Sequence, residues 1–162
     1  MDRPHGISIA RLQPDFARWH ELLALIRSAF AYMDGVIDPP SSAHLLTPEK
    51  LVAKAKQEIA LLAVDNDRIV GCVFARERAN DFYVGKLAVE SECQGQGIGR
   101  RLMEAVEDIA RRHGKGALEL QTRIELVANH ETFARLGFRE SERTAHEGYD
   151  RPTSITMRKV LP

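Results

Sequence analysis

The sequence has few cysteines, no long hydrophobic run and no excess of charge of either sign. Two cysteines are too few for a disulfide framework or a four-cysteine zinc site, and free thiols suit a reducing cytoplasm. No apolar stretch approaches the roughly 20 residues of a membrane helix, and Asp2 and Pro4 begin an N-terminus with no apolar core, unlike a secretory signal. The 23 Lys and Arg residues balance 23 Asp and Glu residues, which argues against a strongly basic nucleic-acid-binding body. We therefore expect a cytoplasmic protein with neither a membrane nor a nucleic acid as partner.

The length and composition are those of one globular domain. The chain has 162 residues, of which 44% are hydrophobic and 28% charged. No internal repeat or low-complexity tract divides it, so we expect a single domain over residues 1–162. The six histidines lack the close paired spacing of a metal site, and no metal is expected.

Apolar periodicity predicts a mixture of strands and helices. Capping residues predict helices that start at Asp15, Thr47 and Asn129, and glycines predict the end of a fourth helix after residue 113. The order predicts an α+β domain with a mixed, mostly antiparallel sheet. Residues 32–46 form the longest loop. The expected strands are 7–12, 59–64, 69–76, 82–89, 118–124, 139–144 and 154–160, and the expected helices are 15–30, one from Thr47 onward, 98–113 and 129–137.

A turn with three glycines joins the strand at 82–89 to the helix at 98–113. Glycine allows positive φ and a close approach of the backbone to a ligand. A helix start adds unpaired N–H groups and the positive end of the helix dipole, so this turn predicts an anion site, most naturally for phosphate. A dinucleotide fingerprint would need glycine where Arg100 stands, and no P-loop sequence occurs. The alternative is a turn that needs glycine only for packing.

The spacing Gln94-x-x-Gly97-x-Gly99, with the preceding Leu87-Ala-Val89, resembles the acyl-CoA-binding motif of the GNAT family of N-acetyltransferases. The resemblance implies an α/β/α sandwich in which the fourth strand splays from the fifth, with a bulge near residues 87–89. It implies acetyl-CoA as co-substrate, with the pantetheine arm paired along Leu87 and Val89 and the pyrophosphate on backbone amides of the turn. Arg100 either adds charge to a phosphate or is a solvated helix residue. The expected cofactor-binding residues are Leu87, Ala88, Val89, Gln94, Gly95, Gln96, Gly97, Ile98, Gly99, Arg100, Asn129 and Phe133.

Phe133 and Asn129 mark a departure from the family pattern near a second motif, Leu136-Gly-Phe138. Relatives often carry a tyrosine at the position of Phe133, where it is thought to protonate the departing thiolate, and phenylalanine cannot do so. Phe133 either packs against the cofactor or belongs to the core. Asn129 either hydrogen-bonds the cofactor or caps its helix.

The catalytic base is a second departure. Several relatives place Glu or His where this chain has Gly85 and Tyr83. Tyr83, with a pKa of about 10, is a poor base at neutral pH. It either orients water or substrate, or is a half-buried aromatic of the sheet. The backbone N–H of Val89 is the expected donor to the oxyanion.

Two loops contain the polar residues that we expect at the acceptor site. For each residue taken alone, a solvated loop position is the favoured alternative. The expected function is acetyl transfer by direct attack of a primary amine of a small molecule or protein, and the alternative is a CoA-binding regulatory or sensor domain. A homodimer is common in the family. The acceptor-site candidates are Tyr32, Asp34, His146 and Tyr149, together with Arg27, Asp38, Glu147, Asp150 and Arg151.

Overall fold

A seven-stranded mixed sheet forms the centre of the molecule. The computed structural model describes residues 6–162, so Asp2 and Pro4 lie outside the described residues. The strand order is β1-β2-β3-β4-β5-β7-β6, and every neighbouring pair is antiparallel except β4 and β5. The predicted mixed, mostly antiparallel sheet is therefore confirmed. The strands are β1 (Ser8–Arg11), β2 (Ile59–Asp65), β3 (Arg68–Glu77), β4 (Asp81–Val89), β5 (Ala117–Arg123), β6 (Arg139–Thr144) and β7 (Ser154–Val160).

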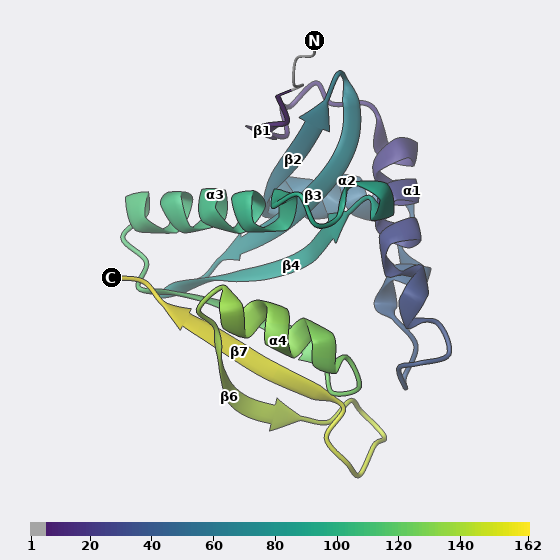
Figure 1. Ribbon diagram of the computed structural model, residues 1–162, viewed down its shortest axis with the longest axis vertical. Helices are drawn as coiled ribbons and strands as arrows, with labels where there is room; N and C mark the ends of the chain where they lie inside the picture. The colour runs from purple at the N-terminus through teal and green to yellow at the C-terminus, as the bar shows by residue number, and fades with distance from the viewer. Residues whose placement is uncertain (1–5) are drawn as a thin grey trace.

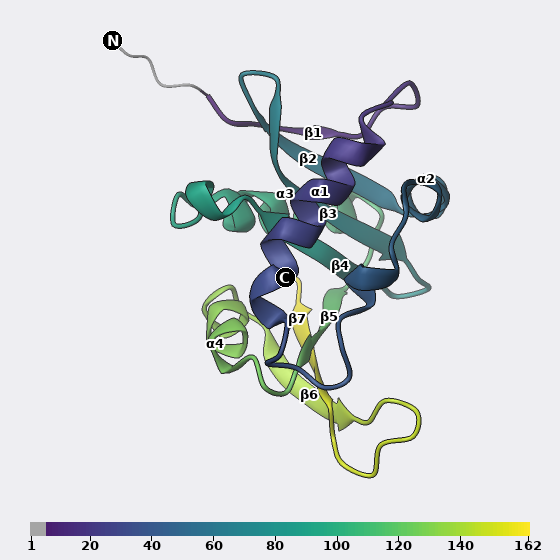
Figure 2. The same cartoon turned by 90° about the vertical axis from the view of Figure 1, so that its right-hand side faces the viewer.

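Helices cover both faces of the sheet and create two cores. Helices α1 and α2 lie on one face, and α3 and α4 lie on the other (Figures 1 and 2). Alternate strand residues serve the two cores, because successive side chains of a strand point to opposite faces: Leu61 and Val73 pack under α3, whereas Leu62 and Cys72 pack under α1. The predicted three-layer arrangement is confirmed. The helices are α1 (Trp19–Phe30), α2 (Pro48–Gln57), α3 (Ile98–Arg112) and α4 (Val127–Arg135), with the short 3-10 helices η1 (Ala31–Met33), η2 (Ser42–Leu45) and η3 (Ser91–Cys93).

The helix starts agree only partly with the capping residues. Thr47 caps α2 as predicted, since its hydroxyl accepts from the backbone N–H of Lys50 at 3.1 Å. The predicted cap at Asp15 is wrong. Helix α1 begins at Trp19, after Arg18, whose guanidinium binds both carboxylate oxygens of Glu21 in the first turn.

The start of α4 also differs from the prediction. The helix begins at Val127 behind Leu126, so Asn129 lies inside the first turn and does not cap it. Its amide instead donates to the hydroxyl of Tyr32 at 2.9 Å. The side-chain bond to a distant residue explains why an asparagine occurs there without a capping role.

Strands β4 and β5 pair only at one end. Asp81–Tyr83 faces Ala117–Glu119, and no further β4–β5 pairing occurs among the described residues, although β4 continues to Val89 and β5 to Arg123 (Figure 2). Against β3, the β4 register shifts so that Lys86 and Leu87 lie opposite one residue. Lys86 takes φ 52°, and this bulge bends the strand. The predicted splay is therefore present, and the bulge lies next to the predicted position.

Candidate functional site

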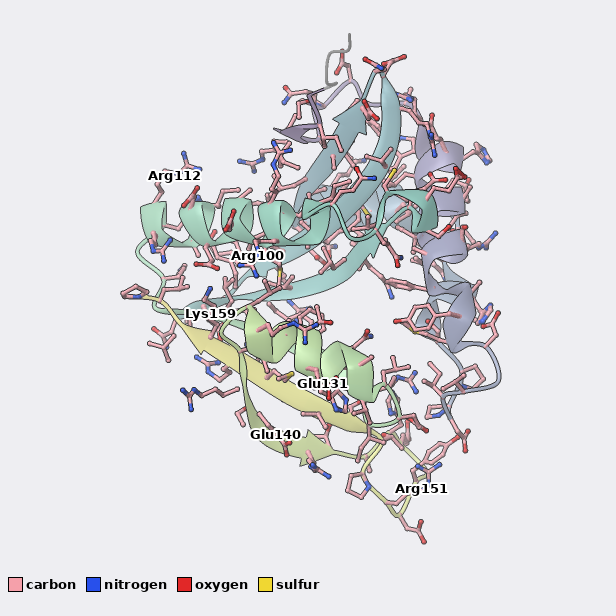
Figure 3. The ribbon with its side chains drawn as sticks, viewed as in Figure 1. Arg100, Arg112, Glu131, Glu140, Arg151 and Lys159 are labelled. Atoms are coloured by element: carbon pink, nitrogen blue, oxygen red, sulfur yellow. The ribbon has the colours of Figure 1, made fainter. Side chains whose placement is uncertain are left out.

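The splayed strands open a cleft of about 810 Å³. It is lined by β4 and β5, by the turn before α3, by α4 and by the segment that follows α1. The β6–β7 loop contributes His146, and Arg151 lies near the tip of that loop (Figure 3). Most of the predicted cofactor residues line this cleft. Gln96 is exposed on the turn and does not.

The glycine turn has the geometry of an anion site. Gly95 and Gly97 take φ 82° and 80°, which favour glycine, and Gly97 is the residue that precedes α3. It makes no side-chain cap, so the first N–H groups of α3 are left for a ligand. A Cβ at Gly95 or Gly97 would meet no atom within 4 Å, and one at Gly99 would only touch Val89 at 3.9 Å. The left-handed φ values explain why Gly95 and Gly97 are glycines, and the open space around them leaves room for a ligand close to the backbone.

The backbone of Val89 faces the open side of β4. The N–H of Glu90 donates to Val70, which makes Gly71 and Val89 a non-hydrogen-bonded pair of the antiparallel ladder. In such a pair both backbone groups point away from the partner strand, here toward the cleft. The Val89 carbonyl accepts from the side chain of Gln94 at 3.3 Å. The Val89 N–H is thus oriented as an oxyanion donor requires.

Tyr83 lies in the cleft between two arginines. The guanidinium groups of Arg76 and Arg78 each lie 5.3 Å from its ring centre. Burial raises the pKa of Tyr83 above its ordinary value of 10.0. The hydroxyl therefore stays protonated at neutral pH and cannot accept a proton there.

Phe133, Asn129 and Arg100 occupy the predicted side of the cleft. Phe133 is half-buried against the core, with its ring 6.0 Å from that of Phe138 in an edge-to-face contact, and it also lines the cleft. Asn129 lines the cleft with Tyr32. Arg100 lies exposed near the start of α3 and extends toward α4 (Figure 3).

The acceptor-side candidates separate into two groups. Tyr32 and His146 line the cleft, and burial lowers the pKa of His146 below 6.5. Asp34 and Tyr149 do not line it. Asp34 is paired with His44 at 2.6 Å, and the hydroxyl of Tyr149 donates to Asp38 at 2.6 Å. Two of the acidic candidates, Asp34 and Asp38, are therefore occupied by partners within the protein.

Sequence reasoning missed three polar residues of the cleft. Lys86, at the bulge, donates to the hydroxyl of Ser42 at 3.0 Å. Arg123, at the end of β5, donates to the backbone carbonyls of the Pro39-Pro40 pair. The Oγ1 of Thr122 is buried and has no hydrogen-bond partner among residues 6–162. Nothing in the local sequence marks these positions. They line one cleft only because the fold places β4 beside β5 and the two strands then diverge.

The two cysteines differ in their surroundings. Cys72 is fully buried, and this burial raises the pKa of its thiol to about 12. Cys72 is therefore a core residue under α1. Cys93 is half-buried at the mouth of the cleft and packs against the core under α3.

Comparison with known proteins agrees with this geometry. A model of the acetyltransferase (GNAT) family matches residues 19–138. The IAA acetyltransferase of Azospirillum brasilense is 32% identical over 159 residues, covering 96% of this chain and 99% of that protein. N-alpha-acetyltransferase 30 of Schizosaccharomyces pombe is 31% identical over 86 residues, covering 50% of this chain and 57% of that protein. The structure of PaiA N-acetyltransferase from Thermoplasma acidophilum in complex with coenzyme A superposes with a TM-score of 0.82 at 18% identity, covering 96% of this chain and 99% of that one.

A splayed parallel pair beside a glycine turn and a helix start defines the acyl-CoA N-acyltransferase fold. With the family match over residues 19–138, this chain belongs to the GNAT family of acetyltransferases. No helix among the described residues is long and apolar enough to cross a membrane. Within residues 6–162, no three His, Cys, Asp or Glu side chains are placed to hold a metal ion together.

Proposed function

We propose that this protein transfers the acetyl group of acetyl-CoA to a primary amine by direct attack. The observation that carries the proposal is the turn before α3. Gly95, Gly97 and Gly99 leave space there that no other side chain fills. A phosphate fits this space, because N–H groups at a helix start and glycine backbone together bind anions. The residues present therefore suit the CoA pyrophosphate.

The chain's residues divide the binding task along the cleft. The backbone amides of residues 94–99 hold the pyrophosphate, and Arg100 supplies a positive charge beside it. The open edge of β4 at Leu87, Ala88 and Val89 receives the pantetheine arm as an added strand. Asn129 and Phe133 contact the cofactor from α4. The co-substrate supplies the acetyl thioester when bound.

Acetyl transfer needs a neutral amine and a stabilised oxyanion. The Val89 N–H donates to the oxyanion. No Asp or Glu of the described residues lines the cleft, and Tyr83 stays protonated, so we assign Tyr83 to orienting the acceptor or a water. The acceptor ammonium loses its proton to water, which is helped by the positive charges of the cleft because like charges lower an amine's pKa. The C–N bond forms as the C–S bond breaks, and CoA would leave as a thiolate that takes its proton from water, because Phe133 has none to give. Alignment beside the thioester supplies much of the rate.

A thiol-release assay tests this function. The purified protein is incubated with acetyl-CoA and a broad panel of primary amines, and release of the CoA thiol is recorded beside direct CoA binding. We expect amine-dependent thiol release. CoA binding without turnover of any amine would support the alternative, a CoA-binding regulatory domain, to which the loss of the family tyrosine at Phe133 also points. Absence of CoA binding at millimolar concentration would reject both.

A further inference from the structure

The charge of the cleft has one sign. Its lining includes five Lys or Arg side chains, from β4, β5, α2, α3 and α4, and not one Asp or Glu among the described residues. The net charge of the chain is zero, so this bias is local. A cleft with positive walls concentrates anions and repels cations. The lining cations are Lys54, Lys86, Arg100, Arg123 and Arg135.

These cations lie on two sides of the cleft. Arg100 and Arg135 belong to α3 and α4, the helices beside the glycine turn, where the CoA phosphates would bind. Lys86 and Arg123 reach the other side, since their hydrogen bonds go to Ser42 and to the carbonyls of Pro39 and Pro40. That segment joins α1 to α2. The second group is therefore available to a molecule other than CoA.

Lys86 and Arg123 lack anionic partners within hydrogen-bond reach. Lys86 contacts the hydroxyl of Ser42 and lies 5.9 Å from the ring centre of Phe30, and both groups are uncharged. Arg123 donates to neutral carbonyls, and the carboxylates of Glu125 and Asp38 act on it only at longer range. Lys54 differs, because it is paired with Glu58 at 2.9 Å. Burial lowers the pKa of Lys86, and Lys54 and Arg123 lower it further. Glu58 acts on Lys86 in the opposite direction without a hydrogen bond. A half-buried cation with no hydrogen-bonded anion is costly, and such groups cluster at functional sites.

Apolar side chains form part of the wall on this side. Phe30, Met33 and Ile37 line the cleft from α1 and the segment after it. An anionic group would pair with Lys86 and Arg123, and an apolar body would cover the side chains of this wall.

We infer that the acceptor is a small amino carboxylate with an apolar side chain, held through its carboxylate by Lys86 and Arg123. This inference rests on the proposed function, and it names the class of acceptor for that same site. The acceptor amine then faces the thioester across the open edge of β4. Polycationic acceptors, such as polyamines and aminoglycosides, would meet five positive side chains and no Asp or Glu among the described residues that line the cleft.

Matched acceptors test the inference. Phenylalanine and leucine are compared with their amides, which keep the amine and side chain but lack the carboxylate, and with spermidine and kanamycin. A charge-assisted hydrogen bond accounts for roughly a 10- to 100-fold difference, so we expect kcat/KM to favour the free acids by about 30-fold. The amide has the less basic amine, so a preference for the acid cannot come from a larger neutral fraction.

Variants of Lys86 connect the preference to the residue. Lys86→Met is expected to lower kcat/KM for phenylalanine by about 30-fold, mostly through KM, and to change the value for its amide by less than about 3-fold. Lys86→Arg is expected to restore most of the loss. Lys56→Met, an exposed lysine of α2, is the matched control and should change neither value.

The outcomes separate the inference from the function beneath it. Faster turnover of the amides, spermidine or kanamycin would overturn the amino carboxylate and leave the acetyltransferase standing. An equal loss for acid and amide in Lys86→Met would also overturn it. CoA binding with no turnover of any amine would reject the proposed function, and the inference with it.

Discussion

The two ends of the β4–β5 pair treat charge in opposite ways. At the paired end, Asp81 binds Arg78 at 2.6 Å and Arg158 at 2.8 Å, and Glu119 binds the same two arginines. At the splayed end, Lys86 and Arg123 contact only neutral groups. Both ends carry two basic side chains, and the two carboxylates that bind them are present only at the paired end.

This difference distinguishes charged groups that stabilise the fold from charged groups that are available to a ligand. At the paired end the carboxylates and guanidinium groups satisfy each other, and the strands stay together. At the splayed end the backbone of β4 is open, the cations are unpaired and the hydroxyl of Thr122 has no partner among residues 6–162. Polar groups without a hydrogen-bond partner and cations without a hydrogen-bonded carboxylate therefore mark the end at which we place the ligands.

The largest effect is expected at the glycine turn that follows the splayed end. Gly97→Glu places a carboxylate where the pyrophosphate would bind. Two unit charges 4 Å apart in a partly exposed site repel by about 4 kcal/mol. We expect CoA affinity to fall by roughly a thousandfold, measured by calorimetry.

Gly114→Glu is the matched control for this change. Gly114 lies just beyond the other end of α3, takes φ 73° and also has open space at its Cβ. It imposes the same backbone strain, about 1–3 kcal/mol, without approaching the turn. CoA affinity should survive in this control. Survival in Gly97→Glu as well would mean that the phosphate does not bind at the turn.

The paired end should respond in stability and not in CoA binding. Asp81→Asn removes a buried carboxylate shared by Arg78 and Arg158, and we expect a loss of about 2 kcal/mol in the free energy of unfolding at pH 7. The hydrogen bond from Arg78 holds the pKa of Asp81 below its usual 3.8. The stabilisation is therefore complete above about pH 4 and is lost as pH falls through the lowered pKa.

Urea unfolding of the wild type and Asp81→Asn at several pH values measures the difference in their free energies of unfolding. The gap between them should narrow toward acid pH. Asp108→Asn is the control, because Asp108 is exposed and 3.7 Å from Arg111, and its gap should be small at every pH. A gap for Asp81→Asn that widens in acid would contradict the assignment of the stabilising charge to Asp81.

The order of strands and helices was predictable, whereas the acceptor side of the site was not. An apolar run at hairpin spacing predicts β4, and glycines before a helix start predict the turn, because both signals are local in sequence. Lys86, Thr122 and Arg123 come from two strands that are far apart in sequence, and these residues line one cleft only in the folded sheet. Asn129 was misread as a cap because its actual partner, Tyr32, lies 97 residues away. Such pairings carry no periodic signal.

The smallest effect concerns the buried hydroxyl at the splayed end. Thr122→Val removes an Oγ1 that has no partner among residues 6–162 and keeps the shape of the side chain, so the free protein should gain up to about 1 kcal/mol, seen as a rise in Tm. Thr156→Val on β7 is the matched control, since its buried Oγ1 accepts from Gln121 at 3.3 Å, and it should lose about 1 kcal/mol. A lower Tm for both variants would mean that the hydroxyl of Thr122 is satisfied in the free protein. The buried hydroxyl at the splayed end would then need no ligand to satisfy its hydrogen bonding.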